Sequence, residues 1–210
     1  MIKKKKIIEK YRINYQQEKN LQNYLDELVK NNSHTNLVGK TTLIEPWRTH
    51  ILDSLQLLPF IENKTSSILD MGSGAGLPGI VLAIAGYSNV TLVDSNGKKI
   101  NFLQKVSQKL NLKINIILNR LEKIYNYKFD IITSRALSNL DKLFSYSQNF
   151  IKTNTVLIFL KGKTVNDEII TAKKKWSFSF EIYSSESDIR GCVLIITKLK
   201  KKNDKNNINI

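Results

Sequence analysis

Short runs of apolar residues, many of them β-branched, recur along this chain from residue 67 to residue 197. Such runs are typical of strands that a sheet buries on both faces. The stretches between most of them repeat apolar positions three and four residues apart, which predicts helices. The predicted strands are 67–71, 90–94, 114–118, 129–133, 155–160, 178–183 and 192–197, and the predicted helices are 78–86, 97–111, 138–150 and 164–175. This alternation favours an α/β fold with a mostly parallel sheet and helices on both of its faces.

The two ends of the chain depart from this alternation. Before the first strand, apolar stripes predict amphipathic helices over 11–32 and 46–58, and Pro46 suits the first position of the second. No helix separates the last two strands, so we expect them to pair antiparallel. These patterns divide the chain into a helical cap (1–62), an α/β domain (63–198) and a Lys- and Asn-rich tail (199–210) that we expect to be disordered.

The first predicted strand leads into a turn in which glycine occupies every second position, at Gly72, Gly74 and Gly76. Glycine supplies positive φ without strain and lets the backbone approach a ligand closely. Pro78 follows where a helix begins, and the N–H groups at a helix start attract polar or negative ligand groups. The motif therefore predicts a ligand site, the alternative being a tight turn with a purely structural role.

Two acidic residues bear on the class of ligand. Asp70 lies two residues before Gly72, and Asp94 ends the second predicted strand. A carboxylate at that strand end accepts hydrogen bonds from ribose hydroxyls, and one beside the turn suits a cationic sulfonium better than a pyrophosphate. The Asp-x-Gly-x-Gly-x-Gly spacing and the terminal strand pair resemble the Rossmann-like class I methyltransferases, which bind S-adenosylmethionine. A nicotinamide-dinucleotide domain, with its Gly-x-Gly-x-x-Gly spacing, is the alternative.

Charge and composition limit the kinds of partner and site that this chain can have. The 210 residues carry 33 Lys and Arg against 18 Asp and Glu, a net charge of +15, which favours a polyanionic partner such as RNA. The lone cysteine, Cys192, excludes an intrachain disulfide and favours a reducing cytoplasm; we expect it in the core. Two histidines without a Cys/His cluster argue against a metal site, and no apolar run reaches the roughly 20 residues of a membrane span.

Five motifs in order resemble one methyltransferase family, over roughly residues 36–197. They are HILDSL (50–55), DMGSGAGLPGI (70–80), DS followed by KK and FL (94–103), SRA (134–136) and LKG (160–162). This set is similar to the small-subunit rRNA guanine-N7 methyltransferases, also called the glucose-inhibited division protein B family. The resemblance implies a seven-stranded class I methyltransferase domain with an antiparallel last strand. It implies methyl transfer from S-adenosylmethionine to N7 of one guanine in the decoding-region loop of 16S ribosomal RNA.

The resemblance also implies site residues. Gly72, Gly74 and Leu77 would bind the cofactor at the turn, and Asp94 would bind its ribose. The residues that would border the adenine are Leu121 and Glu122, and Arg135 would lie beside the methionine moiety and the target base.

Guanine N7 has a free lone pair, so its methylation needs alignment rather than a strong base. We expect Arg135 to hold the base edge or a phosphate, and His50 and Asp53 to close the pocket, although an anchoring ion pair or a helix-to-core hydrogen bond is the alternative for each. The expected contacts to the RNA backbone are Lys98, Lys99, Lys161, Arg190 and the N-terminal lysines.

Other functions remain open at this point. One is a cofactor-binding module that binds RNA without methylating it, and another is a methyltransferase for a different RNA or a small molecule. The sequence predicts a monomer that acts on 16S rRNA or the small ribosomal subunit, with no membrane partner.

Overall fold

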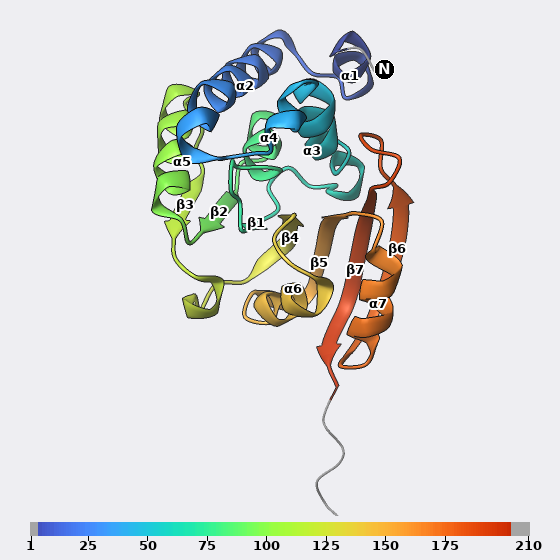
Figure 1. Cartoon of the computed structure of the whole chain (residues 1–210). Coiled ribbons are helices and arrows are strands. Elements are labelled where there is room, and N and C mark those ends of the chain that lie inside the picture. The colour runs from blue at the N-terminus through green and yellow to red at the C-terminus, as the bar shows by residue number, and fades with distance from the viewer. Residues whose placement is uncertain (1–3, 203–210) are drawn as a thin grey trace, which may run out of the picture.

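The computed structural model describes residues 4–202 and folds around one seven-stranded sheet. The strands are β1 (Ile68–Met71), β2 (Val90–Asp94), β3 (Asn115–Leu118), β4 (Phe129–Arg135), β5 (Ile151–Lys161), β6 (Trp176–Ser184) and β7 (Cys192–Lys201). Their order across the sheet is β3-β2-β1-β4-β5-β7-β6 (Figure 1). β7 is antiparallel to both of its neighbours, and the other paired strands are parallel. The predicted fold class, including the antiparallel last strand, is confirmed.

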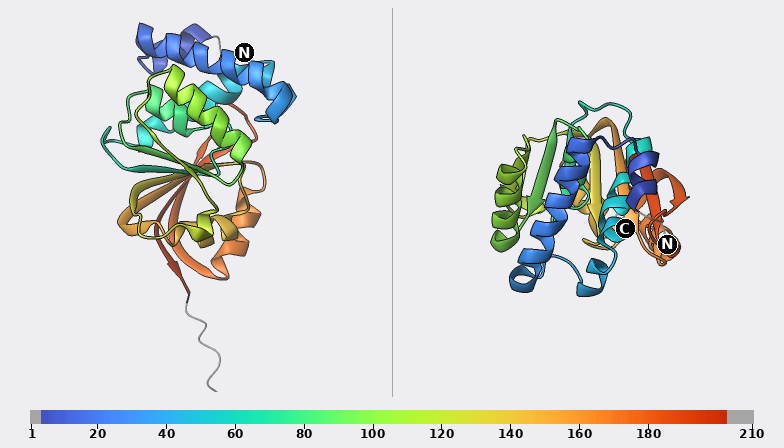
Figure 2. Two further views of the ribbon diagram at one scale, coloured as in Figure 1. Left: turned by 90° about the vertical axis from the view of Figure 1, so that its left-hand side faces the viewer. Right: turned by 90° about the horizontal axis from the view of Figure 1, so that it is seen from above.

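Helices cover both faces of the sheet (Figure 2). They are α1 (Lys4–Lys10), α2 (Tyr15–Thr35), α3 (Asp53–Leu55), α4 (Gly79–Ile84), α5 (Gly97–Lys109), α6 (Leu140–Ser147) and α7 (Val165–Lys173). Shorter helical turns are η1 (Lys40–Leu43), η2 (Trp47–Leu52), η3 (Leu58–Phe60) and η4 (Leu121–Lys123). α1 to α5 pack into the core on one face, whereas α6 and α7 pack into the core on the other. Among residues 4–202, no helix combines the length and the apolar character needed to cross a bilayer.

Strand β1 shows how the sequence divides between the two cores. Ile68 belongs to the core under α4 and α5, while Leu69 and Met71 belong to the core under α6. Successive side chains of a strand point to opposite faces, so this division follows directly from position. Asp70 is fully buried and lies on the α4 side, where its carboxylate accepts a hydrogen bond from the N–H of Gly79.

The helix predicted over 11–32 begins later than expected. The helical conformation is interrupted after α1, where Arg12 has a φ of 50°, and α2 starts only at Tyr15. Asn14 caps α2: its side chain accepts from the N–H of Gln17, and the Gln17 side chain accepts from the N–H of Asn14. This reciprocal cap fixes the helix start and overrides the apolar periodicity on which the prediction depended.

The helix predicted over 46–58 is irregular. Pro46 precedes η2, a π-helical turn, which passes directly into the single turn α3, and η3 follows. π-turns are rare and occur frequently at functional sites. Here the turn carries Thr49 and His50 toward the end of β4.

The C-terminal strand is longer than predicted. β7 continues to Lys201, where it pairs with Trp176 of β6, so the expected tail over 199–210 is wrong in its first residues. Leu199 stands between Lys198 and Lys200 and is buried in the core under α6 and α7. The rest of the expected tail, 203–210, lies outside the described residues.

The N-terminal helices share the core of the α/β unit. Leu21, Leu25 and Leu28 of α2 are buried in the same cluster as residues of α4 and α5. The hydroxyl of Tyr24 donates to the backbone carbonyl of Ala75, inside the glycine turn, at 2.9 Å. α2 therefore packs directly on the predicted ligand site.

Candidate active site

The candidate site lies where the order of strand addition across the sheet reverses. The chain runs outward from β1 through β2 to β3, then returns to the other side of β1 as β4, so β1 and β4 are the topological switch point. Ligands of open α/β sheets bind at the carboxyl ends of strands at such a point. Gly72 follows β1 there, and Arg135 is the last residue of β4.

Three adjoining cavities surround these strand ends. The central cavity, about 460 Å³, is lined by Gly72, Gly74, Leu77, Lys99, Arg135 and residues of the 37–50 segment. The acidic cavity, about 120 Å³, is lined by Asp94, Leu121, Glu122 and neighbours, and shares Gly72 with the central cavity. The loop cavity, about 410 Å³, is lined by Asp53, Lys161, Arg190 and neighbours, and shares Arg135 and Ala136 with the central cavity. All six predicted cofactor residues besides Arg135 line one of the first two cavities.

The glycine turn has the backbone that its sequence predicts. Gly72, Gly74 and Gly76 have φ values of 65°, 57° and 89°, which other residues rarely adopt. A Cβ added at Gly72 would lie 2.5 Å from Cδ1 of Leu137. Asp94 ties the second strand to the turn, because its Oδ2 accepts from the N–H of Gly74 at 2.9 Å. The turn therefore leaves no room for a side chain at Gly72, the residue that the two cavities share.

Asp70 differs from its predicted role. Its carboxylate lines none of the three cavities and accepts from the N–H of Gly79 at 3.1 Å and from the hydroxyl of Thr133 at 3.2 Å. Burial raises its pKa to about 7, against the lowering effect of these two hydrogen bonds. The expectation that this carboxylate faces a cationic ligand is wrong. Asp70 instead joins the start of α4 to β1 and β4.

Arg135 connects the predicted catalytic residues. Its Nη1 donates to Oδ2 of Asp53 at 3.0 Å and to the backbone carbonyl of Thr49 at 3.1 Å. Nη2 lies 3.4 Å from Nδ1 of His50. Both members of the Arg135–Asp53 ion pair are largely buried. The predicted grouping of Arg135, His50 and Asp53 is thus present in the geometry, and it forms the wall between the central and loop cavities.

His50 is a neutral side chain in this arrangement. Burial and, to a smaller extent, the charge of Arg135 lower its pKa from 6.5 to about 3. Since the guanidinium can only donate, Nδ1 of His50 is the acceptor and the proton resides on Nε2. Nε2 then donates to the hydroxyl of Thr42, 3.1 Å away, and that hydroxyl donates to the carbonyl of Gly39. His50 therefore faces Arg135 as a hydrogen-bond acceptor, and its lowered pKa makes it a weak base.

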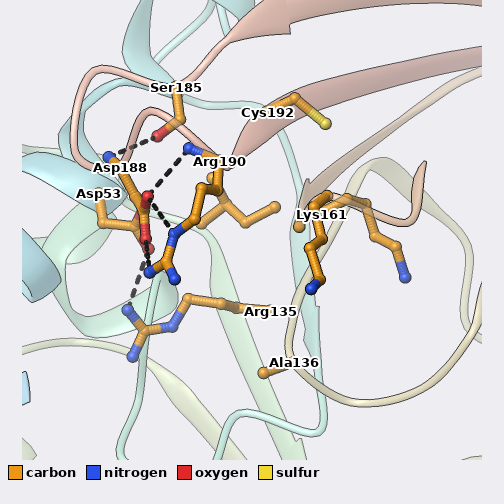
Figure 3. Close-up of a pocket in the computed structure, with 12 residues that line it drawn as sticks. Asp53, Arg135, Ala136, Lys161, Ser185, Asp188, Arg190 and Cys192 are labelled. Atoms are coloured by element: carbon orange, nitrogen blue, oxygen red, sulfur yellow. Dashed lines mark hydrogen bonds and ion pairs between the residues drawn. The ribbon is translucent and has the colours of Figure 1, made fainter. Parts of the chain in front are cut away.

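A loop between β6 and β7 completes the loop cavity (Figure 3). The hydroxyl of Ser187 donates to Oδ1 of Asp53, and Arg48 donates to the carbonyl of Ser187. Gln56 donates to Asp53 and accepts from the N–H of Glu186, at 3.0 and 2.8 Å. The Asp53 carboxylate is therefore held from three sides, by Arg135, by its own helix and by this loop.

The predicted RNA-contact residues fall into different surroundings. Lys99 lines the central cavity, with Nζ 3.9 Å from the Cβ position of Gly74, so it lies beside the predicted cofactor residues. Lys161 is buried and pairs with Glu168 at 2.6 Å, and it donates to the carbonyl of Ser138. This pair fixes α7 and the segment after β4 at the edge of the loop cavity.

Lys98 and Arg190 are exposed, as RNA contacts require. Arg190 pairs with Asp188 through two nitrogens at the mouth of the loop cavity. The N-terminal lysines are partly neutralised, because Lys4 pairs with Glu18 and Lys10 with Glu186. Lys3 lies outside the described residues.

Several lining residues escaped the sequence analysis. Leu137 and Tyr146 line the acidic cavity. Thr42 is hydrogen-bonded to His50, and Ser187 is hydrogen-bonded to Asp53. Leu137 follows the Ser-Arg-Ala motif directly, which is a local signal for its position. Ser187 lies far from Asp53 in sequence, and no spacing rule relates them.

The donor set fits S-adenosylmethionine. A glycine-rich turn connects a cavity lined by an acidic strand end to a second, larger cavity, as a nucleoside joined to an amino acid requires. Asp94 and Glu122 can accept from hydroxyl or amino groups, and Lys99 can pair with a carboxylate. Within residues 4–202, no group of three or more His, Cys, Asp or Glu side chains gathers as metal ligands would. Burial raises the pKa of the Cys192 thiol, which disfavours a thiolate nucleophile.

Comparison with known proteins agrees with this geometry. The model of the GidB family, described as rRNA small subunit methyltransferase G, matches residues 17–191. A protein of Rhodospirillum rubrum named ribosomal RNA small subunit methyltransferase G is 40% identical over 181 residues, which are 86% of this chain and 90% of that protein. A Rickettsia prowazekii protein of the same name is 44% identical over 170 residues, or 81% and 88% of the two chains.

Among solved structures, a ribosomal protein L11 methylase from Lactobacillus delbrueckii superposes with a TM-score of 0.57 at 18% identity, over 69% of this chain and 75% of that one. That likeness concerns the fold. The family match and the two relatives cover most of the chain, including the glycine turn and the Arg135 group. The chain therefore belongs to the rRNA small subunit methyltransferase G family.

Proposed function

We propose that this protein transfers a methyl group from S-adenosylmethionine to N7 of one guanine in the decoding-region loop of 16S ribosomal RNA. The coarser part of this statement follows from family membership: the chain is an S-adenosylmethionine-dependent rRNA methyltransferase. The choice of N7 is supported by one observation. Arg135, paired with Asp53 and in contact with a neutral His50, separates the central cavity from the loop cavity, and within residues 4–202 the acceptors beside it are already engaged, so no free base stands there.

The central and acidic cavities are the proposed cofactor site. Asp94 would accept from the ribose hydroxyls, Leu121 and Glu122 would border the adenine, and Gly72, Gly74 and Leu77 would hold the turn against the methionine part. When bound, S-adenosylmethionine supplies an electrophilic methyl group, and the protein supplies position and field.

The loop cavity is the proposed site of the guanine base. Among the hydrogen bonds within residues 4–202, none uses Nε–H of Arg135, and its Nη2 makes only the contact to His50. These donors can bind O6 of a guanine while N7 stays free to react. An N7 lone pair needs no deprotonation before attack, so a site without a base suits it. Methylation makes the base cationic, and Asp53 offsets the charge of Arg135 beside it.

The target guanine must be unstacked to enter the loop cavity, because the deep major groove of A-form RNA hides N7. The net charge of +15 favours binding to the RNA backbone. Lys98 and Arg190 are exposed candidates for these contacts. We also propose that the protein acts as a monomer, in the cytoplasm where its substrate is found.

The test uses labelled S-adenosylmethionine and small ribosomal subunits from cells that lack this modification. After incubation, the RNA is cleaved chemically at N7-methylguanine and the break is mapped. One break in the decoding-region loop supports the proposal. Label on RNA without cleavage would refute N7 as the acceptor, and absence of label despite cofactor binding would refute the substrate.

Arg135→Ala separates the proposal from an RNA-binding module without activity. Loss of the guanidinium should abolish methylation and leave binding of small subunits unchanged. Arg12→Ala, a change outside the three cavities, is the matched control and should keep full activity. Unchanged methylation by Arg135→Ala would contradict the assigned role.

A further inference from the structure

A fully exposed isoleucine stands at the mouth of the loop cavity. Ile189 is 99% exposed, more than any other large hydrophobic residue in the described part of the chain. Its neighbours Asp188 and Arg190 line the cavity, whereas Ile189 does not. Its side chain therefore stands outside the cavity, one residue from each of two residues that line it. An isolated exposed apolar residue is common on surfaces, so position and rigidity must decide its meaning.

The turn that carries Ile189 is braced. The N–H of Gly191 donates to the carbonyl of Asp188 at 2.8 Å, and the N–H of Ser185 donates to the carbonyl of Gly191 at 3.0 Å. Arg190 and Asp188 form a two-point ion pair across the turn. A Cβ at Gly191 would lie 3.1 Å from Cβ of Ser185, so the turn is closed tightly. Backbone hydrogen bonds of this turn thus hold the Ile189 side chain in its exposed position.

The base of this turn is tied to the catalytic group. Ser187 donates to Asp53, which pairs with Arg135, and Arg48 donates to the carbonyl of Ser187. These contacts fix the tip relative to the guanidinium that is proposed to hold the target base. One set of hydrogen bonds therefore fixes the distance between Ile189 and Arg135.

The chemistry around the tip suits RNA. Arg190, with three-quarters of its side chain exposed, and the exposed Lys163 flank the cavity mouth and can neutralise phosphates. When an enzyme extrudes a base, the neighbouring bases lose a stacking partner at a cost of a few kcal/mol, and proteins commonly insert apolar side chains at such steps. Ile189, held beside the loop cavity, is an apolar side chain placed where a neighbouring base would lose its stacking partner.

We infer that Ile189 packs against the base next to the target guanine and takes the stacking place that the guanine leaves when it enters the loop cavity. This inference rests on the proposed function. Ile189 forms no bond in the reaction and contacts no cofactor residue; it favours the extruded state of the RNA and so acts on substrate binding and delivery.

The test compares three variants of the full chain on small subunits that lack the modification. Ile189→Ala should lower kcat/KM for the subunit about tenfold or more, because the neighbouring base loses its apolar cover. Ile189→Leu should stay close to the unchanged protein. Ile170→Ala, at an isoleucine of α7 that is also exposed, is the matched control and should have no effect. Binding of S-adenosylmethionine should be the same in all of them.

A second readout reports on stacking itself. A synthetic RNA of the decoding-region loop carries 2-aminopurine at one nucleotide beside the target guanine, and at the other side in a second RNA. The unchanged protein and Ile189→Leu should change the fluorescence of one of these probes, and Ile189→Ala should reduce that change.

The outcomes separate the two proposals. If Ile189→Ala equals Ile170→Ala in both assays while the unchanged protein methylates N7, the inference about Ile189 is wrong and the proposed function stands. If the unchanged protein labels no RNA, the proposed function fails and the inference fails with it.

Discussion

The buried carboxyl of Asp70 predicts a measurable pH dependence of stability. Its pKa is raised from 3.8 to about 7 by burial, so the folded state prefers the protonated form. A group whose pKa is raised on folding stabilises the fold below its unfolded pKa and loses that contribution as pH rises through the folded pKa. The window for Asp70 therefore runs from about pH 4 to about pH 7. The full interval corresponds to about 4 kcal/mol.

The perturbation is Asp70→Asn. An asparagine can keep both hydrogen bonds: its oxygen accepts from the N–H of Gly79, and its amide donates to Thr133, whose hydroxyl can then donate to the carbonyl of Leu69. The variant has no charge to bury at any pH. We expect its stability relative to the unchanged protein to rise by about 2 to 3 kcal/mol between pH 5 and pH 8.

The assay is urea unfolding at several pH values between these limits, followed by tryptophan fluorescence. The difference between the two proteins at each pH isolates Asp70, because all other groups titrate alike in both. A difference that does not change with pH, or that shrinks as pH rises, would refute the reasoning. S-adenosylmethionine should bind the variant as it binds the unchanged protein, since the carboxylate lines none of the cavities.

The remaining predictions concern the site itself. Gly72→Ala places a methyl group against a leucine side chain and at a positive φ, so cofactor affinity in calorimetry should fall about tenfold or more, while Gly162→Ala, in open space, should leave it unchanged. His50 should show constant ring resonances in NMR between about pH 5 and pH 8, because its pKa is lowered to about 3; a titration near pH 6.5 would contradict its burial beside a guanidinium. Ser187→Ala removes one of the two hydrogen bonds to Oδ1 of Asp53 and should lower kcat about tenfold or more without changing the KM for S-adenosylmethionine; equal changes in both constants would contradict this.

The sequence was sufficient to predict the elements of the sheet and the residues at its strand ends. The apolar run of β1 and the glycine spacing after it depend on local chemistry, so a short segment is enough to recognise them. The same holds for Asp94, which follows directly from its place at the end of β2. Those residues line the cavities, and their role in cofactor binding stays a prediction.

Two kinds of residue were not predictable in this way. Asp70 was interpreted from its distance to the turn, but a strand places side chains alternately, and its carboxylate points into the core rather than to the ligand. In sequence, Lys99 and Lys161 do not differ from the other lysines of a basic chain. Only the folded structure places Lys99 in the central cavity and pairs Lys161 with Glu168. Ser187 depends on a contact across 134 residues, which no local pattern encodes.

The hydrogen bond from Tyr24 to Ala75 has a consequence for how ligand occupancy spreads through the molecule. Any ligand that binds only the folded turn shifts the opening equilibrium of everything that must open with it. Because α2 shares its core with α4 and α5, its amides should exchange with solvent more slowly when S-adenosylmethionine is bound, although α2 lines none of the three cavities. A helix built from the first part of the chain thereby becomes a reporter of events at the sheet's switch point.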